Sequence, residues 1–180
     1  MRRDEILQMD DENLIALCDM HIYKASGPGG QHRNKVSSAV RLRHRETGIS
    51  ATANDSRSQH ENKVLAVNRL RMNMALRLRE NVDIVKLVLP TYLVGCIFKP
   101  KKPREGAAGM RLEIGRKDRR FWPTAAWLLD LLVACGGKIG DAARLLNIST
   151  GNLTSIFQSD RHLWAAVQEI RRDAGLNHLT

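Results

Sequence analysis

The sequence has few aromatic residues and no long apolar run. Phe, Trp and Tyr together make up 4% of the 180 residues, and nowhere do 18 apolar residues follow one another. A membrane-spanning helix is therefore not expected, because such a helix needs about 20 predominantly apolar residues. The N-terminus also lacks the pattern of a signal peptide, since acidic residues directly follow Met1-Arg2-Arg3. These absences predict a cytoplasmic protein without a membrane partner.

Cysteine is also scarce, and the residue sets of common enzyme sites are missing. The cysteines are too scattered for a disulfide framework and fit reduced thiols in the cytoplasm: Cys18, Cys96 and Cys135. Four histidines lack zinc-ligand spacing and are interpreted as ordinary polar residues: His21, His32, His44 and His60. No Ser/His/Asp set, Cys/His pair or pair of carboxylates lies near the glycine-rich segment at residues 26–31. The sequence thus predicts neither a bound metal nor a cofactor.

Residues 26–31 concentrate glycine and proline in front of a single glutamine. The segment reads Ser-Gly-Pro-Gly-Gly-Gln, and the polar, basic stretch His-Arg-Asn-Lys follows it. Glycine permits a positive φ and a close approach of the backbone to another group, so Gly29 and Gly30 are suited to deliver Gln31 to a crowded, anionic place. An ordinary turn is the plainer interpretation of such a cluster. A nucleotide-binding loop is excluded, because the third glycine of G-x-G-x-x-G would fall on His32 and no Gly-Lys-Ser/Thr follows.

Five short motifs occur in order around this glutamine. They are Gly29-Gly30-Gln31, Asn34-Lys35, Ser38-Ala39-Val40, Thr47-Gly48 and Arg57-Ser58-Gln59. In this order and spacing, residues 22–78 resemble the catalytic domain of class I peptide chain release factors and of their relatives that rescue stalled ribosomes. The resemblance covers roughly a third of the chain, and several spaced motifs are far more specific than Gly-Gly-Gln alone.

The resemblance implies a reaction and a set of site residues. In the family, the Gly-Gly-Gln loop enters the peptidyl transferase centre of the large ribosomal subunit. There the backbone N–H of the glutamine stabilises the leaving 3′ oxygen of peptidyl-tRNA, and its side chain helps to admit water. By resemblance Gln31 takes this role, and Gly29 and Gly30 permit its backbone geometry. The residues implied to support the loop and to bind ribosomal RNA or tRNA are Arg33, Asn34, Lys35, Arg57, Ser58 and Gln59. The family also carries N5-methylation of this glutamine, which makes Gln31 a candidate modification site and a glutamine methyltransferase a candidate partner.

The excess of positive charge independently predicts a polyanionic partner. The chain has 29 Lys and Arg against 19 Asp and Glu, a net charge of +10, and nucleic acid is the usual partner of such a protein. Residues 24–79 hold twelve basic and three acidic side chains, residues 101–120 hold eight and three, and residues 121–180 are neutral. We therefore expect ribosomal RNA to contact the first two stretches, and we expect no DNA binding by the third.

Hydrophobic periodicity predicts the elements of the first 80 residues. We expect a short helix over 10–19, a strand over 21–25, and a hairpin over 40–45 and 49–53 with one buried and one basic face. Ser58-x-x-Glu61 predicts a capping box that opens a helix to about residue 80. Its apolar residues are expected to pack on the sheet: Val64, Val67, Leu70 and Met74. Its basic residues fit either RNA contact or a solvated surface: Lys63, Arg69, Arg71, Arg77 and Arg79.

The remainder of the chain divides into a basic stretch and a helical stretch. Clustered Pro, Gly and Lys predict a linker, with a strand over 110–114. An apolar helix then ends at Gly136-Gly137, and segments 139–146 and 152–157 predict a helix-turn-helix-like pair before a last helix. The second helix of that pair offers amides and hydroxyls but no cation, which favours packing or protein contact over DNA recognition.

These features predict an α+β protein in three parts. Residues 1–80 form the Gly-Gly-Gln catalytic domain, a short β-sheet packed on a long helix with a short N-terminal helix over 10–19. Residues 81–120 form the basic linker, and residues 121–180 form an all-α, helix-turn-helix-like unit.

The predicted function is codon-independent hydrolysis of peptidyl-tRNA on the ribosome, in the rescue of stalled or damaged ribosomes. Reading of stop codons is not expected, because only 25 residues precede the glycine-rich segment, and neither a P-x-T-like nor a Ser-Pro-Phe tripeptide occurs. The long basic C-terminal tail of small rescue factors is also missing, which leaves residues 99–120 or the helical unit to sense a vacant A site. A non-catalytic ribosome- or RNA-binding factor is the alternative function.

Overall fold

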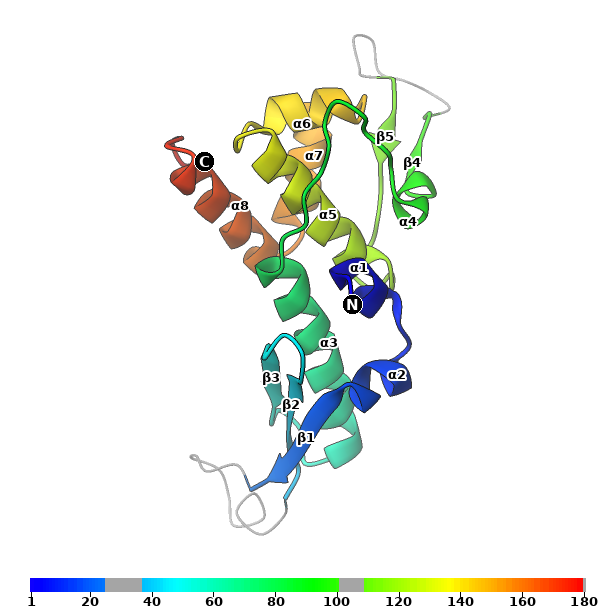
Figure 1. Ribbon diagram of the computed structural model, residues 1–180, viewed down its shortest axis with the longest axis vertical. Coiled ribbons are helices and arrows are strands. Elements are labelled where there is room, and N and C mark those ends of the chain that lie inside the picture. The colour runs from blue at the N-terminus through cyan, green and yellow to red at the C-terminus, as the bar shows by residue number, and fades with distance from the viewer. Residues whose placement is uncertain (25–36, 101–108, 180) are drawn as a thin grey trace. The chain divides into compact units, whose positions relative to one another are not determined.

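The computed structural model of the protein describes residues 1–24, 37–100 and 109–179 (Figure 1). Contacts between Cα atoms divide the chain into two compact units, Met1–Arg77 and Leu78–Thr180. Within the described ranges, no helix is long and apolar enough to cross a membrane. Both units combine helices with a small antiparallel sheet, which confirms the mixed α and β content predicted from the sequence.

The first unit is built on a three-stranded antiparallel sheet. Its strands are β1 (Cys18–Tyr23), β2 (Ala39–His44) and β3 (Ser50–Ala53), in the order β1-β2-β3. Helix α3 (Gln59–Arg77) packs on one face of β2 and β3, beside which it lies in Figure 1. The buried core joins strand and helix side chains: Val40, Leu42, Ala51, Ala53, Ala66, Val67, Leu70 and Met74. The hairpin and the long helix are thus confirmed.

The N-terminal segment differs from its prediction. The short helix expected over 10–19 is present as α2 (Asp11–Ala16), which ends earlier than predicted, and a further helix that was not predicted, α1 (Arg3–Gln8), precedes it. The start of α2 has a physical cause, because the Asp10 side chain accepts a hydrogen bond from the Asn13 N–H at 2.8 Å and so caps the helix. Strand β1 begins at Cys18, three residues earlier than predicted. Arg45 holds this junction by donating to the carbonyl oxygens of Ala16 and Cys18.

Two details of α3 also correct the sequence analysis. Val64 is 41% exposed rather than packed on the sheet. The predicted capping box is only half formed: the Ser58 hydroxyl oxygen accepts from the Glu61 N–H at 3.3 Å, but the Ser58 N–H donates to the hydroxyl of Ser56 at 3.0 Å. The Ser58 hydroxyl therefore caps the start of α3, and the Ser58 N–H is satisfied by Ser56 instead of by Glu61.

The second unit combines a two-stranded ribbon with four longer helices. Helix α4 (Thr91–Val94) leads to β4 (Ile97–Phe98), which pairs with β5 (Arg111–Leu112). Helices α5 (Phe121–Ala134), α6 (Ile139–Leu145), α7 (Thr150–Gln158) and α8 (Arg161–Asp173) follow. Most of α5 is buried, and it ends as expected before Gly136 and Gly137, both at positive φ. The division at residues 80 and 120 stays a prediction.

Candidate functional site

The six residues predicted around the glycine-rich segment lie outside the described residues. They are Gly29, Gly30, Gln31, Arg33, Asn34 and Lys35. The structure does describe the two strand ends that this connection joins. Tyr23 ends β1, Ala39 begins β2, and the two residues are partners in the ladder. The connection over residues 24–38 therefore leaves the sheet and returns to it at the same end.

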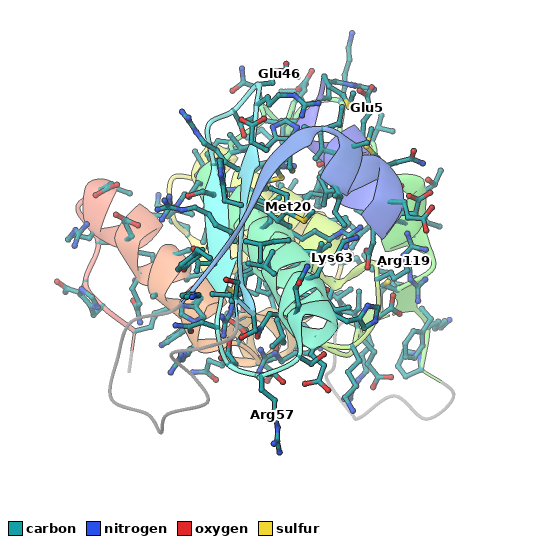
Figure 2. All side chains as sticks on the ribbon, turned by 90° about the horizontal axis from the view of Figure 1, so that it is seen from below. Glu5, Met20, Glu46, Arg57, Lys63 and Arg119 are labelled. Atoms are coloured by element: carbon teal, nitrogen blue, oxygen red, sulfur yellow. The ribbon has the colours of Figure 1, made fainter. Side chains whose placement is uncertain are left out.

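The other three predicted site residues lie at the start of α3. Arg57 is exposed, and Figure 2 shows its side chain projecting away from the ribbon. It has no hydrogen bond or salt bridge to any other residue in the described ranges. Gln59, the first residue of α3, is also exposed. Ser58 instead caps α3 through its hydroxyl oxygen. Arg57 and Gln59 are thus available to a ligand, whereas the Ser58 hydroxyl has a structural partner.

Asn62 is a buried polar residue of this region that the sequence analysis missed. Its side chain is fully buried, and its amide nitrogen donates to the carbonyl oxygens of Ser38 at 2.8 Å and Ser56 at 2.7 Å. Its amide oxygen accepts from the Ser56 N–H at 3.0 Å. One side chain therefore ties together the residue that precedes β2 and the loop that carries Arg57. The sequence holds a signal for it, because Asn62 is the polar member of a row at fourfold spacing with Ala66, Leu70 and Met74.

The arginines of α3 are not a uniform solvated surface. Arg69 donates to both carboxylate oxygens of Asp55 at 2.7 and 2.8 Å and to the Thr52 carbonyl oxygen. These hydrogen bonds lower the pKa of Asp55. Arg71, which is 8% exposed, donates to Asp11 and to a backbone carbonyl in the α1–α2 connection. Both guanidinium groups already have partners within the first unit, so neither is a first choice for RNA contact.

His44, the last residue of β2, is a buried histidine. It is 1% exposed, its Nδ1 lies 3.0 Å from the Thr47 hydroxyl, and Nδ1 accepts from the Thr47 N–H at 3.3 Å. Burial lowers the pKa of this imidazole. The turn that follows β2 contains Gly48 at a φ of +68°, as its Thr-Gly sequence predicts. His44 therefore stabilises the hairpin turn through its contacts with Thr47.

Part of the positive charge of residues 109–120 is neutralised locally. Arg116 pairs with the buried carboxylate of Asp160 at 2.6 Å, and Arg111 pairs with Glu113 at 2.8 Å. Arg120 pairs with Asp118 at 2.7 Å, and its hydrogen bonds lower the pKa of Asp118 to about 2. The Arg116 pair joins this stretch to the start of α8. These contacts weaken the expectation that the whole stretch is a free RNA-binding arm.

Helices α6 and α7 lie at the two segments predicted to form a helix-turn-helix-like pair. One amide of the second helix, that of Asn152, is already hydrogen-bonded within the protein. The Asn152 amide nitrogen donates to the Leu112 carbonyl oxygen at 2.9 Å, and its amide oxygen accepts from the Leu112 N–H at 2.8 Å. Base recognition by a second helix needs free amide or basic side chains. The structure therefore gives Asn152 a packing role.

Comparison with known proteins relates the first part of the chain to peptide chain release factors. Residues 9–84 match the RF-1 domain. The chain is 47% identical over 78 residues to peptide chain release factor 1 of Erythrobacter litoralis, covering 43% of this chain and 21% of that protein. It is 56% identical over 52 residues to peptide chain release factor 2 of Borreliella burgdorferi, covering 29% and 14%. A longer match, 29% identical over 132 residues and covering 70% and 37%, relates it to peptide chain release factor 1 of Salinibacter ruber. The chain thus spans well under half of these relatives, and the resemblance of its first unit to the release factor domain is confirmed.

Proposed function

We propose that this chain, which carries an RF-1 domain over residues 9–84, hydrolyses the ester bond of peptidyl-tRNA on the ribosome without reading a codon. The biological setting would be the rescue of stalled or damaged ribosomes. The observation that carries the proposal is the match to the RF-1 domain together with Gly29-Gly30-Gln31 in the connection between the paired ends of β1 and β2. Codon independence is part of this proposal, and the release assay below tests it with a message that ends in the P site.

The proposed reaction needs positioning more than acid–base chemistry. Water attacks the ester carbonyl carbon, the bond to the 3′ oxygen of the terminal adenosine breaks, and that oxygen receives a proton as the carboxylic acid forms. Gln31 does not titrate, so its contribution would be to orient water and to donate a hydrogen bond to developing negative charge. The ribosome and the tRNA would supply the rest of the site, which fits an enzyme that acts only in their presence.

The described residues support this proposal by what surrounds the glycine-rich connection. Asn62 holds Ser38, the last residue before β2, against the loop that carries Arg57. Arg57 is exposed and has no partner in the described ranges, so it can meet an RNA phosphate. A buried amide therefore joins the returning end of the connection to the loop of Arg57, the cation that we propose binds RNA.

Peptide release from purified ribosomes tests the proposal. The ribosomes carry formylmethionyl-tRNA in the P site on a message that ends there, and the free formylmethionine is measured over time. Gly30→Ala is the inactivating variant, because it adds a Cβ where the backbone of the loop must come close to its target. Gly115→Ala is the matched control, since no atom lies within 4 Å of the added Cβ.

We expect release by the unchanged protein and by Gly115→Ala, and no release by Gly30→Ala. Release that required a stop codon in the A site would overturn codon independence. Tight ribosome binding without release by the unchanged protein would overturn the enzyme and leave the non-catalytic ribosome- or RNA-binding factor.

A further inference from the structure

The face of the sheet that is turned away from α3 is polar. The β2 side chains that point toward α3 are buried: Val40, Leu42 and His44. Arg41 and Arg43 alternate with them, point to the opposite face and are exposed. The ladder register adds four cross-strand neighbours on the same side: Asp19, His21, Ser50 and Thr52. We call these six residues, together with Tyr23, the outer face.

Arg41 and Arg43, like Arg57, have no hydrogen bond or salt bridge in the described ranges. Arg45, Arg69 and Arg71 each donate to backbone carbonyls within the fold. The carboxylate of the outer face, Asp19, is the ladder partner of Arg43, but the salt bridge it makes, at 3.7 Å, is with Arg45. Two guanidinium groups on neighbouring outward positions of one strand are thus left to meet an external anion.

We propose that the outer face binds the phosphate backbone of ribosomal RNA through Arg41 and Arg43. A guanidinium group presents several donors in a plane and suits phosphate oxygens. Residues 24–79 carry the largest excess of positive charge in the chain. This charge extends beyond the two arginines and complements the negative charge of RNA over a larger surface. The hydroxyls of Ser50 and Thr52 and the half-exposed ring of Tyr23 are further groups of the kinds that bind RNA backbone and bases.

The position of the outer face connects it to the proposed site. Tyr23 ends β1 and is the ladder partner of Ala39, two residues before Arg41. The outer face therefore begins where the glycine-rich connection leaves the sheet. This inference rests on the proposed function, because that function takes the ribosome as the partner. An acidic protein surface is the other anionic partner, and the experiment below separates it from RNA.

Binding of the full chain to purified large ribosomal subunits, and to their RNA freed of protein, tests the inference as a function of salt. The test variant is R41Q/R43Q. The control K138Q/R144Q removes the same charge from exposed positions of the second unit. We expect the slope of log K against log salt to fall by about 1.4 to 1.8 in the test variant, which corresponds to two lost phosphate contacts. Both probes should show this decrease, and thermal unfolding should be unchanged because the two side chains are exposed and unpaired.

Three outcomes overturn the inference or the function behind it. Equal slopes for R41Q/R43Q and K138Q/R144Q would overturn the inference, and so would weaker binding to subunits without weaker binding to free RNA, because the partner would then be a ribosomal protein. Peptide release is measured on the same preparations. If the unchanged protein shows the salt-dependent contacts but releases no peptide, the proposed hydrolase fails while the RNA-binding face stands.

Discussion

Asn62 and Ser38 are 24 residues apart in the sequence and are joined by a hydrogen bond of 2.8 Å between a buried side-chain amide and a backbone carbonyl. The same amide holds Ser56 through both its nitrogen and its oxygen. The end of the glycine-rich connection and the loop of Arg57 therefore depend on one residue. A substitution that displaces the Asn62 side chain would therefore disturb both segments.

Replacing Asn62 by aspartate should reduce peptide release more than it reduces folding. The new carboxylate keeps the shape of the side chain but has no hydrogen to donate, so the hydrogen bonds to the carbonyl oxygens of Ser38 and Ser56 are lost, whereas the one accepted from the Ser56 N–H is retained. We expect the release rate at saturating protein to fall by between about 10- and 100-fold, as is typical when a reacting group is displaced by a fraction of an ångström to one ångström.

Asn73 provides a matched control for this prediction. It also lies on α3, and its amide nitrogen donates to the Ser50 carbonyl oxygen of β3 at 2.8 Å, away from the glycine-rich connection. Asn73→Asp should lower the free energy of unfolding by about 1–3 kcal/mol and leave the release rate of the folded fraction unchanged. Equal loss of release in the two variants would show that Asn62 stabilises the domain without positioning the site.

Arg71 should contribute to stability rather than to RNA binding. Arg71→Met keeps the apolar stem but removes the donors to Asp11 and Met9. Because Asp11 is about half exposed and can return to water, we expect a loss of about 1–3 kcal/mol in urea unfolding. Arg172→Met, which removes an exposed pair with Glu169, should cost less than about 0.5 kcal/mol. An equal cost for both would contradict the structural role of Arg71.

Burial of His44 predicts a pH dependence of stability. Its pKa in the folded protein lies below the ordinary value of 6.5, so the unfolded chain binds the proton more readily. The stabilisation is complete above the unfolded pKa and is lost as the pH falls below about 6.5 toward the folded pKa. Urea unfolding between about pH 5 and 8 should show this decline, and His44→Gln should flatten it. A decline of the same size in His44→Gln would assign it to another group.

The two glycines after α5 should respond differently to alanine. Both have positive φ, 59° at Gly136 and 76° at Gly137, which costs a side chain roughly 1–2 kcal/mol. No atom lies within 4 Å of a Cβ added at Gly136, whereas one added at Gly137 would lie 3.2 Å from the Arg171 Cα. Gly137→Ala should therefore destabilise the second unit more than Gly136→Ala does. Equal midpoints of thermal unfolding for the two variants would contradict this close approach of α8.

Local patterns predicted the elements of the first unit well. Alternation along residues 40–45 identified the hairpin because its two faces differ in polarity, and the Ser58 cap with apolar residues at helical spacing identified α3. The same spacing misplaced Val64, because the buried row of α3 runs through positions 62, 66, 70 and 74 and Val64 lies beside it. The same row contains the polar residue Asn62, which a pattern counted from apolar residues alone does not include.

The pairing of charged side chains could not be predicted in the same way. Arg71 finds Asp11 60 residues away, and Arg116 finds Asp160 in the second unit. Such contacts depend on how the helices and strands pack. A count of charged residues along the sequence therefore cannot distinguish Arg41 from Arg71. The structure separates them, because one is exposed without a partner in the described ranges and the other is buried between helices. The net positive charge predicts a polyanionic partner, but the fold determines which of the basic side chains are free to contact one.

The contact between Asn152 and Leu112 also affects how the ribbon β4–β5 meets other chains. An uncovered strand edge offers backbone N–H and carbonyl groups to any passing strand, which is a common route to aggregation. At Leu112 both groups are already bonded to one side-chain amide, and the neighbouring Met110 N–H donates to the Asn147 carbonyl oxygen at 3.0 Å. Helix α7 and the turn before it thus imitate a third strand, and they shield the ribbon from self-association along that side.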